Sequence, residues 1–301
     1  MSVRVISFDL QQKAITELNE NPKKINEDIE NLRCWLKHQR HLKFKDENQF
    51  LLGVLRRCKF SIEKAKKNLE TYYTMKTHSP EIYLNRDPFK SGIQSMLTTK
   101  TIFINTSSST LIGCVFWRHV ENMGVSLIDA VQLASMFLDI LINECDAFII
   151  NKSILIVDFK DVPLKACLKW DINLLKKMLL CLQVYRIRIL HIILINVSPV
   201  LERIYNILYS ILSKKMQSTI LIYDEQKSYK LYETVSRDLL PEEFSGTAQN
   251  TENWKQKIEN YKNWFKDDEK YTCNEKLRVG PSLTHSEIFG TEGSFRKLDV
   301  D

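Results

Sequence analysis

Between residues 153 and 216 this chain alternates stretches of strand type with stretches of helix type, and no other feature of the sequence constrains the fold as much. Ser153–Val157 and Ile189–Val197 are short apolar runs that predict buried strands. Leu164–Leu182 lies between them and Pro199–Met216 follows them, and both stretches space their apolar residues as helices do. Strands that alternate with helices predict βαβ units, and therefore an α/β fold with a mostly parallel sheet and flanking helices.

The first part of the chain predicts a separate helical domain. Residues 25–39 and 47–58 place apolar side chains on one helical face, and Ser61 caps a third helix with an acid in its first turn. We therefore expect an N-terminal three-helix bundle over residues 25–80. Residues 85–90 are rich in Asn, Asp and Pro, which predicts a hinge after it.

The sheet is expected in a second domain, residues 90–246. Further strands and one helix are predicted at 101–105, 111–117, 126–143 and 219–223. Residues 251–266 predict a final amphipathic helix, and the chain beyond Asp267 is charged and then contains Gly and Ser. We expect residues 247–301 to form a C-terminal helix and a largely disordered tail.

Composition indicates a cytoplasmic protein. The net charge of +6 suits an anionic membrane surface, but by itself it describes only a Lys-rich exterior. The seven cysteines are scattered, which favours reduced thiols over a disulfide framework. The N-terminus has no apolar signal region, and the most apolar run, Ile187–Leu201, is too short to span a bilayer. Any membrane association is therefore expected to be transient and peripheral.

The sequence contains no enzyme signature: Gly-x-Gly-x-x-Gly, the phosphate loop and Gly-x-Ser-x-Gly are all absent. His38 and His41 are three residues apart, but no third metal ligand is near them, so we expect both to be solvated. His191 is expected to be a core histidine with its hydrogen bonds satisfied. Small-hydrophobe packing is the better interpretation of the remaining candidates, Cys145, Cys167 and Cys181. We expect no catalytic residue, no metal and no cofactor.

Several motifs, taken in order, carry a family resemblance. They are Phe50–Tyr73, Pro80–Ile82, Asn85–Pro88, Ile154–Asp158, Tyr185–Asn196, the stretch through Lys215, Leu239–Gly246 and the tail Ile288–Asp301. Together they resemble the CRAL-TRIO family, in particular insect members similar to α-tocopherol transfer protein, cellular retinaldehyde-binding protein and the clavesins. The resemblance covers roughly residues 25–246 and the tail. The sequence departs from it at Lys160 and Asp161, where relatives have an acid and a glycine, and at Ser245.

The resemblance implies a lipid-binding domain whose sheet forms the floor of a pocket and whose mobile helix closes it as a lid. Pro199–Met216 is the expected lid, and it holds more apolar side chains than one buried stripe needs. By the match, and by alternation along the strand, the expected pocket residues are Val131, Ala134, Leu138, Ser153, Leu155, Val157, Tyr185, Ile187, Ile192, Leu201, Ile204, Tyr205, Leu208 and Leu212. Ser153 and Tyr185 are the polar groups best able to orient a ligand. The alternative is ordinary core packing.

The family's phosphoinositide-contacting basic positions fall on Lys67, Arg188 and Lys215. Arg186 is expected to help, because three other positions of that patch have become Cys58, Leu190 and Thr219. Phosphates pair well with Arg and Lys side chains. The alternative is a solvated basic face.

These features favour a monomeric carrier that binds one hydrophobic small molecule, of the tocopherol, retinoid or phospholipid kind, with phosphoinositide contact at membranes and no nucleic acid partner. A second hypothesis is a non-transporting, phosphoinositide-dependent membrane adaptor whose pocket has collapsed. A third is an interaction module that regulates a GTPase or a trafficking partner.

Overall fold

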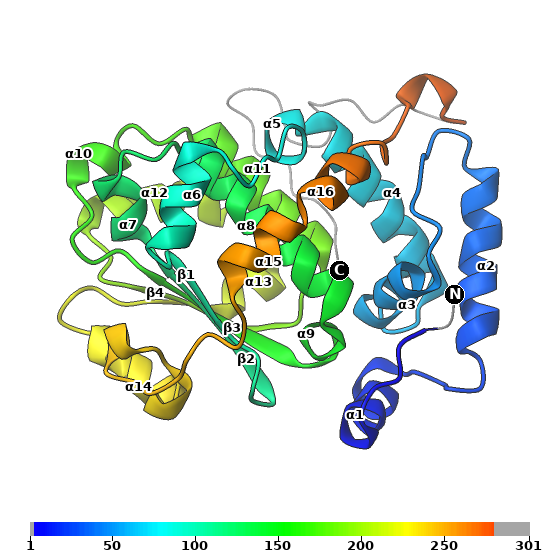
Figure 1. Ribbon diagram of the computed structural model, residues 1–301, viewed down its shortest axis with the longest axis horizontal. Helices are drawn as coiled ribbons and strands as arrows, with labels where there is room; N and C mark the ends of the chain where they lie inside the picture. The colour runs from blue at the N-terminus through cyan, green and yellow to red at the C-terminus, as the bar shows by residue number, and fades with distance from the viewer. Residues whose placement is uncertain (1–2, 280–301) are drawn as a thin grey trace.

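The computed structural model describes residues 3–279 and has a five-stranded sheet at its centre (Figure 1). The strands follow one another across the sheet in chain order, and they are β1 (Ile102–Asn105), β2 (Thr110–Phe116), β3 (Lys152–Asp158), β4 (Ile189–Ile195) and β5 (Ile220–Ile222). β1 is antiparallel to β2, and the other neighbours are parallel. The predicted α/β class with a mostly parallel sheet is confirmed.

The helices surround this sheet and form a separate layer at the N-terminal end (Figure 1). They are α1 (Phe8–Leu18), α2 (Ile25–His38), α3 (Asn48–Arg57), α4 (Ile62–His78), α5 (Pro80–Tyr83), α6 (Ser91–Thr98), α7 (Trp117–Asn122), α8 (Leu127–Glu144), α9 (Asp146–Ile150), α10 (Leu164–Cys167), α11 (Ile172–Tyr185), α12 (Pro199–Tyr209), α13 (Lys214–Thr219), α14 (Leu231–Thr234), α15 (Trp254–Asn260) and α16 (Lys262–Asp268).

The three predicted N-terminal helices form as α2, α3 and α4, and they share one buried cluster. Ser61 caps α4 as predicted, its side chain accepting a hydrogen bond from the amide of Lys64. Helix α1 was not predicted. Glu20 lies just after α1. The fully buried Arg56 pairs with Glu20 at 2.8 Å and with Asp146 of α9 at 2.7 Å, and these ion pairs hold the N-terminal helices against α9.

The two faces of the sheet are covered differently. One face packs its residues Ile112, Ile154, Ile156 and Ile193 into a buried cluster with the segment 228–248. The other face lies under the helices, among them α8 and α12 (Figure 1). Because side chains alternate along a strand, every second residue of β3 and β4 points toward those helices.

Three predicted helices are each interrupted. The prediction of one helix over Leu164–Leu182 is wrong. α10 ends at Cys167, and Asp171 caps a second helix, α11, by accepting hydrogen bonds from the amides of Asn173 and Leu174. Pro199–Met216 is likewise wrong as one helix: α12 ends at Tyr209, and Ser213 caps α13. The predicted helix 251–266 divides into α15 and α16 at Tyr261.

The residues just after α16 contact the N-terminal helices, and the expectation of a largely disordered tail stays a prediction. The backbone of Cys273 forms an antiparallel β-bridge with Leu42, and the Arg278 side chain forms an ion pair with Glu70 of α4. The tail motif Ile288–Asp301 lies outside the described residues, and the boundaries 25–80, 90–246 and 247–301 stay predictions.

Candidate ligand-binding site

The helix-facing side of the sheet has an apolar centre that we call the sheet floor, consisting of Val115, Leu155, Val157, Ile192, Leu194 and Ile220. The pairing register places these residues side by side: Leu155 is opposite Ile192, and Val157 is opposite both Val115 and Leu194. Ile220 of β5 extends the row beyond Ile192. In parallel strands, paired residues share a face of the sheet. The floor is therefore a continuous apolar surface over four strands.

Although β3 and β4 are inner strands, the floor is only half-buried. Leu155, Val157 and Ile192 join none of the buried apolar clusters that residues 3–279 form, whereas Ile154 and Ile156 on the opposite face are fully packed. A covered apolar strand normally packs to crystal-like density. The floor therefore faces space that the described side chains do not fill.

Helix α8 leaves two of its inner residues half-buried. Between Ala130 and Leu141 every residue of this helix is buried except Ala134 and Leu138, which are half-buried. They are four positions apart and so share one side of the helix. Val131, in contrast, is buried in a cluster with Leu174 and Val184 of α11.

Helix α12 packs beside β4 and α11. Leu201 packs in a cluster that Leu194 of the floor also joins, and Leu208 packs against Leu175 of α11. Ile204 and Tyr205 are half-buried, and Leu212 is buried just beyond the helix. The outer side carries Ile207 and Tyr209, which are 44% and 40% exposed. α12 thus has apolar residues on both its inner and its outer side.

The two polar residues predicted to orient a ligand have different surroundings. Ser153 is buried on the floor's side of β3, and its hydroxyl has no hydrogen-bond partner among the described residues. Tyr185 is buried between domains instead, and its hydroxyl donates to Asp139 at 2.8 Å. Burial raises the pKa of Tyr185 well above its usual value, and the charge of Asp139 raises it further. Ser153 is therefore the better candidate for a group that orients a ligand. Ile187 is half-buried and packs against the cluster that contains Tyr185.

Tyr185 belongs to a buried ion network that joins three parts of the chain. Arg86 binds Asp139 at 2.5 Å and Asp268 at 3.0 Å, and Lys76 binds Asp268 at 2.5 Å. Burial would lower the pKa of Arg86, but the two carboxylates outweigh it and raise the pKa above its usual value. Such a network stabilises the fold only while every charge keeps its partner. Its role here is to hold α4, α8 and α16 together.

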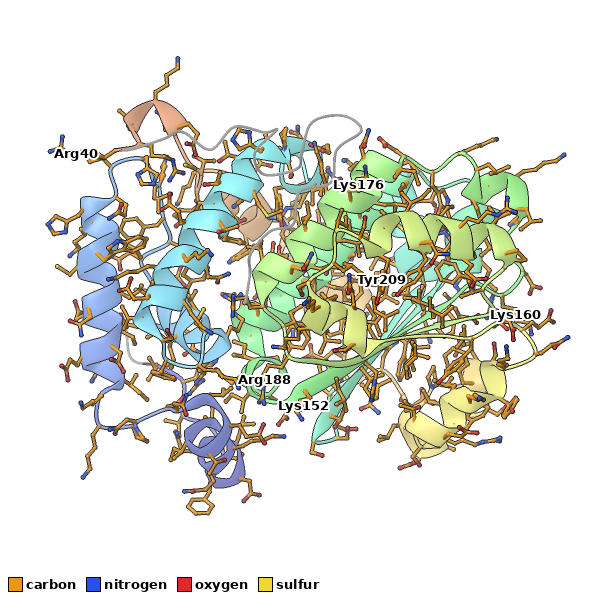
Figure 2. All side chains as sticks on the ribbon, turned by 180° about the vertical axis from the view of Figure 1, so that it is seen from behind. Arg40, Lys152, Lys160, Lys176, Arg188 and Tyr209 are labelled. Carbon is orange, nitrogen blue, oxygen red and sulfur yellow. The ribbon has the colours of Figure 1, made fainter. Side chains whose placement is uncertain are left out.

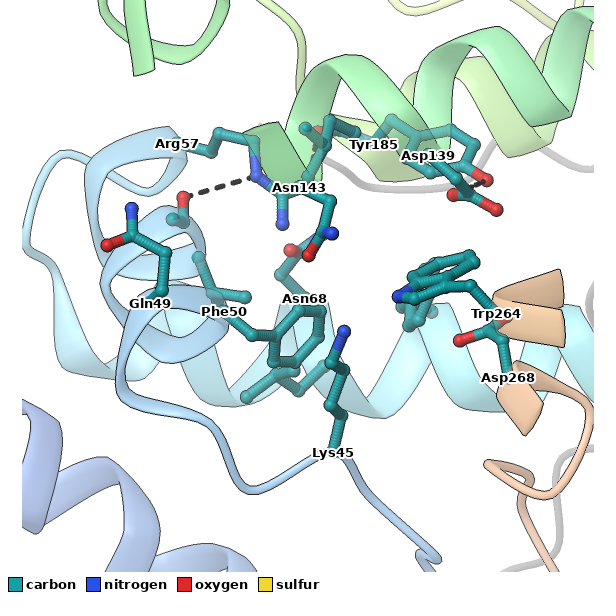
Figure 3. Close-up of a pocket in the computed structure, with 15 residues that line it drawn as sticks. Lys45, Gln49, Phe50, Arg57, Asn68, Asp139, Asn143, Tyr185, Trp264 and Asp268 are labelled. Atoms are coloured by element: carbon teal, nitrogen blue, oxygen red, sulfur yellow. Dashed lines mark hydrogen bonds between the residues drawn. The ribbon is translucent and has the colours of Figure 1, made fainter. Parts of the chain in front are cut away.

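Beside this network lies a small cavity between the domains, which both apolar and polar side chains line and which Figure 3 shows. Lys45 and Arg57 point into it, and its volume is about 30 Å³, room for a water or two. Arg57 donates to the carbonyls of Gly53 and Tyr185, and burial lowers the pKa of Arg57. The cavity is too small for a lipid.

The predicted basic residues lie on different elements. Arg188 hydrogen-bonds the carbonyl of Ile150 and pairs with Glu17 of α1 at 2.5 Å. The hydrogen bond from Arg188 to the Glu17 carboxylate lowers the pKa of Glu17. Figure 2 shows Arg188 close to Lys152, beside α1. Neither helix α1 nor this pairing was predicted from the sequence.

Lys67 on α4 and Lys215 on α13 are exposed, and Arg186 is a half-buried residue in the left-handed conformation at the end of α11. Arg186 lies near Cys58, where burial raises the pKa of the thiol and the arginine opposes that rise.

The histidine predictions need two corrections. His41 is buried and bonds Glu70 at 2.7 Å, so it is not solvated. His191 is half-buried, and its Nδ1 has no partner within the described chain, so it is not a satisfied core histidine. Over residues 3–279 no group of three or more His, Cys, Asp and Glu side chains could hold a metal ion. In the same range no helix is both long enough and apolar enough to cross a bilayer.

Comparison with known proteins gives two matches to family models. The model described as CRAL/TRIO domain matches residues 89–246, and the model described as Pinta-like, UBA domain matches residues 21–93. The chain is 24% identical over 248 residues to the human protein named alpha-tocopherol transfer protein-like, which covers 81% of this chain and 71% of that one. It is 24% identical over 244 residues to clavesin-1 of Xenopus laevis, covering 78% and 72%. Among solved structures it is similar to the crystal structure of Sfh5, with a TM-score of 0.45 and 12% identity, covering 84% of this chain and 92% of that one.

Proposed function

This chain belongs to the CRAL/TRIO domain family, whose members are lipid-binding transfer proteins, and from that premise we propose that it carries one hydrophobic small molecule on the sheet floor. The observation that carries the proposal is the half-buried, unpacked row of Leu155, Val157 and Ile192 at the centre of a covered sheet. Each methylene of a bound tail that leaves water there contributes about 0.8 kcal/mol. An apolar ligand of the tocopherol, retinoid or phospholipid kind would therefore be held without any charged contact.

The walls of this site are assigned as follows. Ala134 and Leu138 of α8 line one side, and Ile204 and Tyr205 of α12 line the other. Ser153, buried and without a hydrogen-bond partner in residues 3–279, would orient a ligand hydroxyl or carbonyl. Four further expected pocket residues, Val131, Leu201, Leu208 and Leu212, would support these walls from buried positions, and the half-buried Ile187 stays an expected pocket residue. Tyr185 would act indirectly, through the network around Asp139.

Helix α12 is the proposed lid, and it would move about the connection to α13. The helix is joined to α13 through Ser210–Ser213, and it exposes Ile207 and Tyr209 outward. An amphipathic helix of this kind can place its apolar side in the interfacial region of a bilayer. We expect the carrier to be a cytoplasmic monomer that meets membranes transiently.

A non-transporting membrane adaptor is the second candidate, favoured by the basic cluster of Arg188 and Lys152 (Figure 2). Glu17 already neutralises part of this cluster, which reduces its attraction for phosphoinositides. An adaptor would float with anionic vesicles in a salt-sensitive manner and extract nothing from them.

Lipid extraction from mixed vesicles, followed by identification of the bound molecule, tests the carrier proposal. Leu155→Trp fills the floor, and Leu155→Met, which conserves the side-chain volume, is the matched control. The proposal expects extraction by the parent chain and by Leu155→Met, and at least a tenfold loss in Leu155→Trp. Equal extraction by the two variants would place the ligand elsewhere, and flotation without extraction by the parent chain would favour the adaptor.

A further inference from the structure

We propose that the small cavity between the domains binds one small monovalent anion of the chloride class. The cavity lies among α3, α4, α8 and α16, and its volume is about 30 Å³ (Figure 3). A single water needs about 10–15 Å³ of such volume, and a halide ion is little larger than a water molecule. The cavity therefore has room for one halide ion, whereas polyatomic anions such as phosphate and sulfate are too large.

Two cations of the N-terminal domain are held at this cavity. Lys45 precedes α3 and Arg57 ends it, and Figure 3 shows both side chains pointing into the cavity. Lys45 is 5% exposed, and its main-chain N–H donates to the hydroxyl of Tyr73 at 3.0 Å. The Lys45 ammonium lies 4.8 Å from the centre of the Trp264 ring, a contact that attracts the charge to the ring. The positive groups are therefore in place before an anion binds.

Neither cation has a full counter-charge among residues 3–279. The Arg57 guanidinium donates to the carbonyls of Gly53 and Tyr185, which are neutral groups. Lys45 forms its ion pair with Glu47, at 3.5 Å, and the Glu47 side chain is 52% exposed. An ion pair with so exposed a carboxylate contributes little. Burial accordingly lowers the pKa of Arg57, because the carboxylate charge near it does not outweigh the loss of solvent.

The two carboxylates that line the cavity are already neutralised by other cations. Asp139 pairs with Arg86, and Asp268 pairs with both Arg86 and Lys76. This buried network thus holds two positive and two negative charges and is balanced in itself. The positive charge that faces the cavity from the N-terminal domain therefore remains in excess.

The excess charge favours an anion over a water in the cavity. Water could fill the same volume, but it would leave the buried positive charge uncompensated, and buried charges are normally paired. A halide ion between the Lys45 ammonium and the Arg57 guanidinium would accept N–H donors from both groups. A monovalent ion suffices, because Glu47 already offsets part of the charge of Lys45.

Thermal unfolding of the full chain, with chloride exchanged for gluconate at constant ionic strength, tests for the anion. Gluconate is too large for the cavity and serves as the non-binding anion. A ligand that binds the folded chain stabilises it, so the unfolding midpoint should rise by about 2–4 °C for each tenfold increase in chloride above the dissociation constant. Bromide should have the same effect as chloride. A midpoint that is independent of both halides would overturn the proposal.

A variant and a diffraction measurement locate the anion. Lys45→Met removes the buried charge and keeps an unbranched side chain, and Lys43→Met, at an exposed position of the same segment, is the matched control. The rise of the midpoint with chloride should disappear in Lys45→Met and persist in Lys43→Met. In crystals grown with bromide, anomalous diffraction should place one bromide between the Lys45 ammonium and the Arg57 guanidinium. The proposal is also overturned if Lys45→Met keeps the chloride dependence, or if the cavity holds water and no bromide.

Discussion

Leu208→Ala tests whether α12 is a lid that opens on its own. Leu208 is 8% exposed and packs against Leu175 and Ile211. Truncation of a fully buried leucine costs about 2–5 kcal/mol. Only one side of α12 is docked, since Ile207 on the outer side is 44% exposed, so we expect the lower end, about 2–3 kcal/mol. At about 1.4 kcal/mol for each factor of ten, local opening becomes roughly 30 to 150 times more frequent.

Amide hydrogen exchange, read by mass spectrometry, measures this opening directly. The amides of α12 should exchange faster by the expected factor, and in both chains their free energy of opening should lie well below that of β3 and β4, which open only on global unfolding. Ile207→Ala is the matched control, an aliphatic truncation on the exposed side of the same helix, and it should change α12 by less than about threefold. If the amides of α12 and β3 have the same free energy of opening in the parent chain, the helix opens only when the domain unfolds, and the lid assignment is refuted.

Three further predictions concern other parts of the molecule. Arg86→Ala leaves Asp139 without its ion-pair partner in a buried site, so urea denaturation should show that the free energy of unfolding falls by about 3–5 kcal/mol. A fall below about 1 kcal/mol would contradict a stabilising role for the network. The hydrogen bond from Arg188 lowers the pKa of Glu17, so the docking of α1 is stabilised above the unfolded pKa and weakens as the pH falls through the folded one; hydrogen exchange of α1 should show this acid dependence, and Glu17→Gln should abolish it. Cys34 is the exposed member of seven free thiols, so native thiol titration should find one fast-reacting group that disappears in Cys34→Ser, and a second fast thiol would indicate that the half-buried Cys145 or a buried cysteine is accessible.

Local sequence patterns predicted most of the fold. The strand at Ser153–Val157 and the helix capped by Ser61 follow from apolar spacing and a capping side chain, which depend on neighbouring residues alone. Helix α1 had such a signal too: Ser7 caps it, and Ala14 and Leu18 are four positions apart. The interruption at Asp171 was missed because the apolar spacing continues through it, although the Asp side chain is itself a recognisable cap.

The arrangement of the site could be predicted only in part. Alternation along β3 put Leu155 and Val157 on one face, and the structure agrees. The hydrogen bond from the Tyr185 hydroxyl to Asp139, a residue 46 positions away, could not be predicted, because no local pattern reports such a contact. The pairing of Arg188 with Glu17 spans 171 positions, so a basic motif gave no sign that it is already occupied.

The most direct test of the carrier proposal is native mass spectrometry of the full chain after incubation with mixed-lipid vesicles and removal of the vesicles, with organic extraction to identify what is released. The proposal predicts the mass of the chain plus one hydrophobic molecule, at one-to-one stoichiometry and of a single chemical class. The bare mass of the chain, obtained after incubation with every vesicle composition, would contradict a working lipid site on the sheet floor.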